Sequence, residues 1–190
     1  MTYNGFHNAI RKISSISDES LWELDKISEL TLFRKNEFVL KEGAVCDAIY
    51  FVNQGLVRIY YYKQDKEISE WFAFENSFCF SIVSYFTKKP SHLIIQCLED
   101  TEVLAISHDG LEKLRKTNFE ISNFAFELIS GSLILSQLRM ESLQFETAQQ
   151  RYENLVKAQP TIIQRVPVNY IASYLGISAE TLSRIRAKIH

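Results

Sequence analysis

Two residues of opposite charge, Glu180 and Arg184, stand four positions apart among serine, threonine and basic residues. If this segment is helical, both side chains lie on one face, one turn apart. An arginine there can donate two parallel hydrogen bonds to the acceptor pair of guanine, and a glutamate can accept from the amino group of cytosine. The same spacing also suits an ordinary surface ion pair, worth about 0.3–0.5 kcal/mol, which requires no nucleic acid. Contacts to phosphates, which position a protein without reading sequence, suit the neighbouring residues Thr181, Ser183, Arg186 and Lys188.

Such side chains need a rigid frame, and residues 168–185 have the pattern of one. A first helix over Val168–Leu175 would meet a second helix over residues 179–190 at a steep angle. Ala172 supplies the small residue that the crossing needs, and Gly176 supplies the left-handed residue of a tight turn. Ser178 is predicted to cap the second helix and completes the candidate DNA-binding residues. The predicted shared core consists of Ile171, Leu175, Ile177, Leu182 and Ile185. The pattern indicates a helix-turn-helix, although small helical bundles that bind no DNA share it.

The charge of this segment differs from that of the whole chain. The 190 residues include 21 Lys or Arg and 23 Asp or Glu, a net charge of −2. Residues 178–190 alone contain three basic residues against one acidic residue. These numbers exclude a protein that coats nucleic acid with its whole surface, and they allow a local basic patch at this segment.

A long helix is predicted from about Phe119 onward. Two sets of residues recur every seven positions, as in a coiled-coil seam: Ile121, Leu128, Leu135 and Ser142, interleaved with Phe124, Gly131, Leu138 and Phe145. We expect two copies of the chain to pair here, with Gly131 allowing a close backbone approach. The dimer-helix residues are Ile121, Phe124, Leu128, Gly131, Leu135 and Leu138. The alternative is a helix that lies on its own β domain, and a second apolar face at Phe126, Ile129 and Leu133 would allow both contacts.

Short segments rich in β-branched and aromatic residues precede this helix, between Thr31 and Ile106. The predicted strands are Glu37–Lys41, Ala48–Val52, Leu56–Tyr62, Ile68–Phe74, Leu93–Leu98 and Glu102–Ile106. Alternation within Leu56–Tyr62 predicts a half-buried antiparallel strand. Several strands without intervening helices indicate a β-sandwich or barrel. Ser17 and Ser107 are predicted to cap short helices on either side, and Ala148–Ala158 is predicted to be a further helix.

Other functional classes receive no support from the sequence. Uncharged stretches such as Val166–Ala179 are shorter than the ~18–20 apolar residues of a membrane span, so no membrane partner is expected. The cysteines are odd in number and far apart, which is typical of the reducing cytoplasm: Cys46, Cys79 and Cys97. The histidines are too scattered for a metal centre or a catalytic cluster: His7, His92, His108 and His190. We therefore predict no catalytic residue, no metal site and no enzymatic activity.

The order of β domain, long helix and terminal helix-turn-helix resembles the Crp/Fnr family, the relatives of the cyclic-AMP receptor protein. Residues 180–185, Glu-Thr-Leu-Ser-Arg-Ile, are similar to its base-reading segment, and the run from Gly43 to Gly55 is similar to its β-roll. The short chain is similar to Bacteroidetes-type members. The resemblance implies an α+β fold with a β-roll effector-type domain over residues 1–118, a dimerisation helix over 119–145 and a DNA-binding domain over 146–190. It also implies a cytoplasmic homodimer that binds a pseudo-palindrome in double-stranded DNA and contacts RNA polymerase.

One stretch departs from the cyclic-nucleotide-binding relatives, which have a Gly-Glu-Leu segment before an Arg-Ser pair. Phe78–Cys97 contains no Gly, Glu or Arg, so an anionic phosphate would lose its bidentate partner. We therefore expect an unknown effector rather than cyclic AMP. Candidate pocket residues, which would alternatively fill a core, are Phe78, Phe80, Ser81, Tyr85, Ser91 and His92. The alternative function is a ligand-sensing β-roll that acts through protein contacts without binding DNA.

Overall fold

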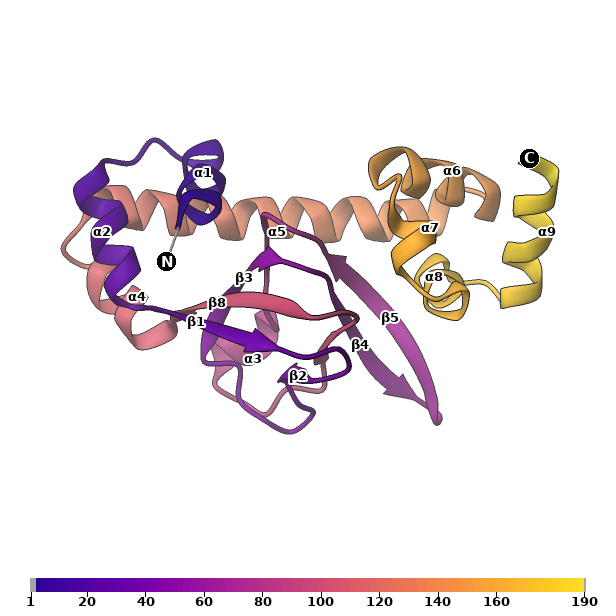
Figure 1. The fold of residues 1–190 in the computed structure, drawn as a ribbon, viewed down its shortest axis with the longest axis horizontal. Helices are drawn as coiled ribbons and strands as arrows, with labels where there is room; N and C mark the ends of the chain where they lie inside the picture. The colour runs from indigo at the N-terminus through magenta and orange to yellow at the C-terminus, as the bar shows by residue number, and fades with distance from the viewer. Residues whose placement is uncertain (1–2, 190) are drawn as a thin grey trace. The chain divides into compact units, whose positions relative to one another are not determined.

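The computed structural model describes residues 3–189, without the side chain of Ile189, and the described chain contains nine helices and eight strands (Figure 1). The helices are α1 Asn4–Ile13, α2 Asp18–Lys26, α3 Ile82–Thr87, α4 His108–Arg115, α5 Phe119–Phe145, α6 Ala148–Ala158, α7 Ile162–Arg165, α8 Val168–Leu175 and α9 Ala179–Ile189. The strands are β1 Ser28–Phe33, β2 Phe38–Leu40, β3 Ala48–Gln54, β4 Val57–Lys63, β5 Lys66–Ala73, β6 Ser77–Cys79, β7 Ile94–Cys97 and β8 Thr101–Ser107.

The contacts divide the chain into two units. The N-terminal unit contains Met1–Ile59 and Phe72–Gly131, and the C-terminal unit contains Tyr60–Trp71 and Ser132–His190. The predicted boundary at residue 118 differs from this division, because the first half of α5 packs within the N-terminal unit. The tip of the β4–β5 hairpin groups with the C-terminal helices, a feature that the sequence did not indicate.

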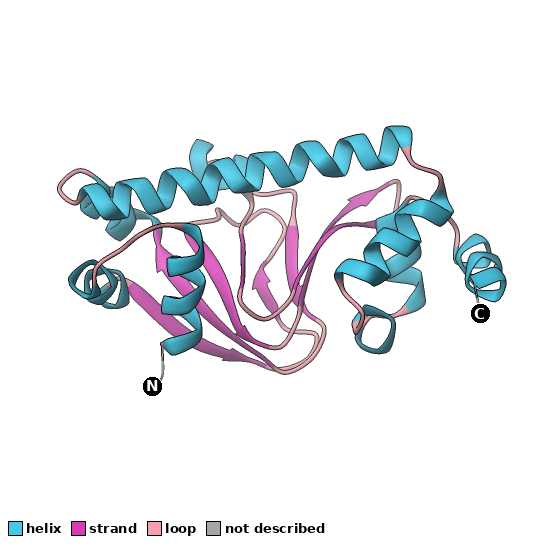
Figure 2. Cartoon of the chain, turned by 90° about the horizontal axis from the view of Figure 1, so that it is seen from above, coloured by secondary structure: helices cyan, strands magenta, loops and turns pink. Residues whose placement is uncertain are grey.

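The strands form two four-stranded sheets, in the orders β1-β8-β3-β6 and β2-β7-β4-β5 (Figure 2, magenta). In the first sheet β8 pairs antiparallel with both β1 and β3, and β3 also pairs antiparallel with β6. The core of this sheet is fully buried at Ile49, Phe51 and Ile106. Burial of such side chains stabilises the fold by about 1.5–3 kcal/mol each. The predicted antiparallel β domain followed by a long helix is confirmed.

Strand β4 differs from its prediction. Val57, Ile59 and Tyr60 are all buried, and Arg58 has no exposed surface. The prediction of a half-buried strand is therefore wrong for this segment, because β4 is an interior strand of its sheet and its first residues are covered on both faces. Only toward the hairpin tip does the strand emerge, and Tyr62 is exposed.

Most helix boundaries agree with the sequence. Ser17 caps α2 by accepting a hydrogen bond from the Ser20 amide, and Ser107 caps α4 by accepting one from Gly110. The predicted limits of the helices now labelled α6 and α8 are those observed. Elements that local patterns missed are α1, α3, α7, β1 and β6. Helix α1 depends on tertiary packing, since it buries Phe6 and Ile10 and contacts β3.

The predicted seam of α5 is wrong over its first half. Ile121, Phe124 and Leu128 are buried within their own unit, so they cannot face a second copy. From Gly131 onward the stripe is less covered, and Leu135 and Leu138 are exposed. The heptad spacing could not separate these cases, because a β-roll and a partner helix both require one continuous apolar stripe.

Helix α5 is also the one described helix whose length and composition would allow it to cross a membrane, with a mean hydropathy of 1.2 in its most apolar window. Only 22% of that window is buried. One such helix is weak evidence for a membrane span, because a helix that packs against protein passes the same test.

Candidate nucleic-acid interface

The turn between α8 and α9 has the geometry that the sequence predicts. Gly176 has φ 69° and ψ 32°, in the left-handed region that glycine adopts without strain. The amide of Gly176 donates to the Ser173 carbonyl at 3.1 Å, and that of Ile177 donates to the Ala172 carbonyl at 3.0 Å. This bonding ends α8 and lets α9 begin after three residues.

The two helices share a small apolar core. Four residues of this core are buried: Ile171, Ala172, Leu175 and Leu182. Ile177 and Ile185 are half-buried. Ser178 caps α9, because its Oγ accepts from the Thr181 amide at 3.2 Å. The pairing of α8 with α9 thus rests on the residues chosen from the sequence.

The first turn of α9 carries an ionised carboxylate. A hydrogen bond from the Ser178 side chain lowers the pKa of Glu180, and attraction to Arg184 lowers it further. Both charges are therefore present at neutral pH on one exposed face of the helix. A carboxylate so placed can accept from an amino group, and the guanidinium beside it can donate to a paired acceptor.

The structure brings the predicted DNA-binding residues together at this end of the C-terminal unit. Exposed side chains are Ser178, Glu180, Ser183, Arg184 and Lys188, and half-buried ones are Thr181 and Arg186. His190, the last residue of the predicted helix, lies outside the described residues. Residues 132–190 contain seven Lys or Arg and four Glu, so the excess of positive charge extends beyond α9.

The candidate effector residues do not form one site. Phe80 and Tyr85 are buried in edge-to-face contact, with ring centroids 5.3 Å apart. Ser91 donates to Ser81, Oγ to Oγ, at 2.9 Å, so these buried hydroxyls satisfy each other. Four of the six residues therefore pack as a filled core.

The other two candidates lie elsewhere. The Phe78 ring packs against Phe51 and Phe124, with centroids 5.0 and 5.9 Å away, and His92 is exposed. The grouping of Phe78 and His92 with this pocket is wrong, because neighbours in sequence here point to different surroundings.

A cyclic phosphate finds no matching residues in this region. Ser81 and Ser91 bond to each other, and the stretch between Phe78 and Cys97 contains no arginine. Sequence reasoning did not predict that Arg58 on β4 is fully buried. Its only signal was a charged residue between two apolar neighbours. The described residues also contain no group of three His, Cys, Asp or Glu able to hold a metal ion.

Comparisons with known proteins agree with this architecture. Residues 30–118 match the family described as "Cyclic nucleotide-binding domain". FixK2 from Bradyrhizobium japonicum has a TM-score of 0.74 and 20% identity, over 86% of this chain and 85% of that chain. CLP from Xanthomonas campestris, described as a c-di-GMP responsive global regulator, has a TM-score of 0.69 and 17% identity, over 91% of both chains.

A third similar structure is described as a transcriptional regulator of the Crp/Fnr family from Eubacterium rectale. It has a TM-score of 0.68 and 17% identity, over 90% of this chain and 82% of that chain. No curated protein sequence gives a significant match. Residues 30–118 therefore match the cyclic nucleotide-binding domain family, and the chain has the fold of solved Crp/Fnr transcription regulators.

Proposed function

We propose that this protein is a sequence-specific DNA-binding transcription regulator whose α9 enters the major groove. The observation that carries the proposal is the exposed pair Glu180 and Arg184 on a helix fixed by the Gly176 turn. The helix N-terminus faces base edges in such docking, and the hydroxyl and basic side chains around it contact phosphates.

The exposed apolar surface of α5 supports the homodimer that we propose. Along the predicted seam Leu135 is 50% exposed, Leu138 54% and Phe145 79%. An apolar stripe that stays exposed on a single chain marks a surface for a partner. Pairing of two copies would relate two recognition helices by two-fold symmetry. Half-sites would then lie about 34 Å apart, one turn of DNA, in a pseudo-palindrome.

The effector is unknown, and we propose that it is not cyclic AMP, because residues 78–97 contain no arginine to bind a phosphate and the buried hydroxyls of Ser81 and Ser91 bond to each other. Contact with RNA polymerase and a cytoplasmic location are implied by the resemblance and remain predictions. A metal-dependent enzyme would need a cluster of metal ligands, and the described residues contain no group of three His, Cys, Asp or Glu that could hold a metal ion.

The decisive experiment is selection of bound sequences from a randomised duplex library, followed by titration of the selected duplex. We expect the wild type to enrich a palindromic site. Arg184→Ala should weaken binding by about 1–3 kcal/mol, about 5- to 150-fold, and relax selection at one base pair of each half-site.

Lys113→Ala on α4 is the matched control, because it removes one exposed positive charge from the N-terminal unit. It should leave the selected sequence unchanged. If the wild type enriches no sequence in dilute salt, the DNA-binding function is refuted and the protein-contact alternative is favoured. If Arg184→Ala changes affinity equally for every duplex, Arg184 contacts phosphate rather than a base.

A further inference from the structure

The last four carbonyls of α8 all have partners, and the partners come from different parts of the C-terminal unit. Backbone amides of the turn donate hydrogen bonds to the carbonyls of Ala172 and Ser173. Arg139 on α5 donates through Nη2 to the Tyr174 carbonyl, and Arg151 on α6 donates through Nε to the Leu175 carbonyl at 3.1 Å. Two cations thus satisfy carbonyls that a helix normally leaves to water, at its negative end.

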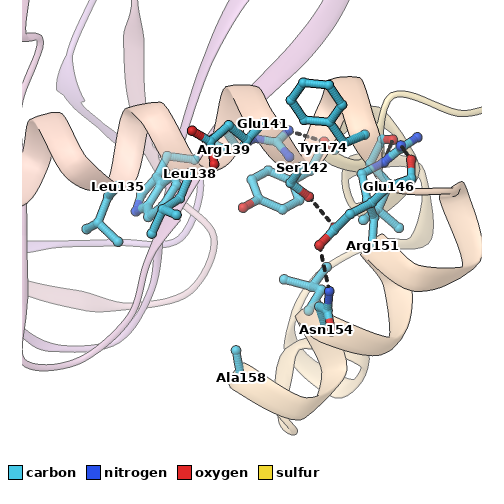
Figure 3. Close-up of a pocket in the computed structure, with 14 residues that line it drawn as sticks. Leu135, Leu138, Arg139, Glu141, Ser142, Glu146, Arg151, Asn154, Ala158 and Tyr174 are labelled. Carbon is cyan, nitrogen blue, oxygen red and sulfur yellow. Dashed lines mark hydrogen bonds between the residues drawn. The ribbon is translucent and has the colours of Figure 1, made fainter.

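Arg139 is fixed by more than one contact. Its guanidinium carbon lies 3.7 Å from the centroid of the Tyr174 ring, so it stacks on the side chain whose carbonyl it binds. Burial lowers the pKa of Arg139, with a further contribution from the charge of Arg151, yet arginine stays protonated at any physiological pH. Figure 3 shows Arg139 beside Tyr174 along one wall of a hollow of about 590 Å³.

Arg151 joins two helix ends. Its Nη1 donates at 2.5 Å to the carbonyl of Glu146, the residue that follows α5. The Glu146 carboxylate accepts from Ser142 at 2.5 Å and from Asn154 at 3.0 Å, on α5 and α6 (Figure 3). One residue, Arg151, therefore links the junction of α5 and α6 to the end of α8.

The β4–β5 hairpin provides a third attachment for α8. Ser173 Oγ accepts from the Ser69 amide at 2.9 Å and donates to the Glu67 carbonyl at 3.0 Å. The Trp71 ring lies edge-on to Tyr174, with centroids 6.3 Å apart. Ser173 is thus bonded to the hairpin and Tyr174 contacts Trp71, so a change at this end of α8 alters the surroundings of Trp71.

We propose that Arg139 and Arg151 are positioning residues, which hold the C-terminal end of α8 and thereby fix where α9 presents Glu180 and Arg184. The proposal rests on the DNA-binding function, since fixing α9 matters for affinity only if α9 contacts DNA. Neither arginine is needed in the DNA interface. Their effect passes through the turn at Gly176, which leaves three residues between the clamped end of α8 and the start of α9.

The test combines a DNA-free and a DNA-bound measurement on the full chain. Arg139→Ala is compared with the wild type in amide hydrogen exchange and in affinity for the selected duplex. We expect exchange over residues 176–183 to become about tenfold faster, from the loss of a charged hydrogen bond, while β3 amides keep their rates. Affinity for the selected duplex should fall about tenfold.

Trp71 gives an independent spectroscopic signal. In a Trp22→Phe background, which removes the other tryptophan, emission comes from Trp71 alone. Arg139→Ala should change that emission, because the Tyr174 ring loses the guanidinium on its face. Arg139→Lys keeps the charge without the planar stack, and we expect it to restore only part of the exchange protection.

Lys157→Ala on α6 controls for charge, because it removes one exposed cation from the same unit. The proposal is overturned if Arg139→Ala exchanges like the wild type over residues 176–183, or if it loses no more affinity than Lys157→Ala. If the wild type binds no duplex, the proposed function fails. The exchange and emission results alone then decide whether Arg139 and Arg151 hold the end of α8. If Arg139→Ala does not fold, Arg139→Lys and Arg151→Lys carry the same comparison.

Discussion

Gly131→Ala separates the packing of α5 within one chain from its pairing with a second copy. A Cβ at this position meets no atom within 4 Å, so alanine fits without a clash in the single chain. Glycine in a helix interior costs about 1 kcal/mol relative to alanine. We therefore expect the free energy of unfolding of the dilute protein to rise by about 0.5–1 kcal/mol, which corresponds to about 1–4 °C in Tm for a chain of this length.

The proposed dimer should respond in the opposite direction. Gly131 is the point at which the apolar stripe leaves its own β-roll, and a second helix approaching there would meet the new methyl group. Overpacking of a fitted contact costs about 1–3 kcal/mol, so the dimer Kd should rise about 5- to 150-fold. Sedimentation equilibrium measures the Kd, and urea unfolding below that Kd measures the stability of the single chain.

Ser136→Ala is the control, since it improves helix propensity five positions later, on a different face of α5. If the dilute Gly131→Ala protein is less stable than wild type, the statement that Gly131 has free space around it in the single chain is refuted. A variant that is more stable and dimerises with an unchanged Kd would place Gly131 outside the interface, and the seam would then have to use the face of Phe126 and Leu133.

Two further predictions test the N-terminal unit. Hydrogen bonds from the hydroxyls of Ser17 and Ser20 and from the Ser17 amide lower the pKa of Glu120 to about 2. Because the folded pKa lies below the unfolded value near 4.5, this stabilisation is present above pH 4.5 and is lost as the pH falls toward 2. Urea unfolding should therefore show Glu120→Gln less stable than wild type at pH 7 and the difference should vanish near pH 2; a constant difference would contradict the assignment. Gly55→Ala should destabilise by more than about 3 kcal/mol in thermal unfolding, because strain at positive φ adds to a Cβ only 2.6 Å from Thr101 Oγ1 and 2.8 Å from the Asp100 carbonyl oxygen. A loss near 1 kcal/mol would show that this turn adapts.

Local signals were strong where the structural requirement is short-range. Helix α8, the turn at Gly176 and the cap at Ser178 agree with the sequence, because the left-handed turn, the cap and the 3.6-residue stripe are short-range requirements. The candidate DNA-binding residues are therefore identifiable from residues 168–188 alone. Their use in DNA recognition stays a prediction until binding is measured.

Elements that depend on a distant surface were not predictable in the same way. Helix α1 has a clear apolar face but packs on β3, and β1 is a strand because β8 pairs along its whole length. Phe78 and Phe80 are separated by one residue, yet one packs on Phe124 and the other on Tyr85. Their surroundings depend on which elements the fold brings to each face.

The sequence by itself determined the order of β domain, long helix and C-terminal helix pair, the turn chemistry of that pair and the residues on its exposed face, because these follow from backbone preferences and hydrophobic period. Only the tertiary structure decided which half of the α5 stripe is buried in its own chain and which partners hold the end of α8. Arg139 and Tyr174 lie 35 positions apart, and no local pattern pairs a guanidinium with a helix end at that separation. Such contacts arise from the packing of whole helices, where burial and the helix dipole select the partner.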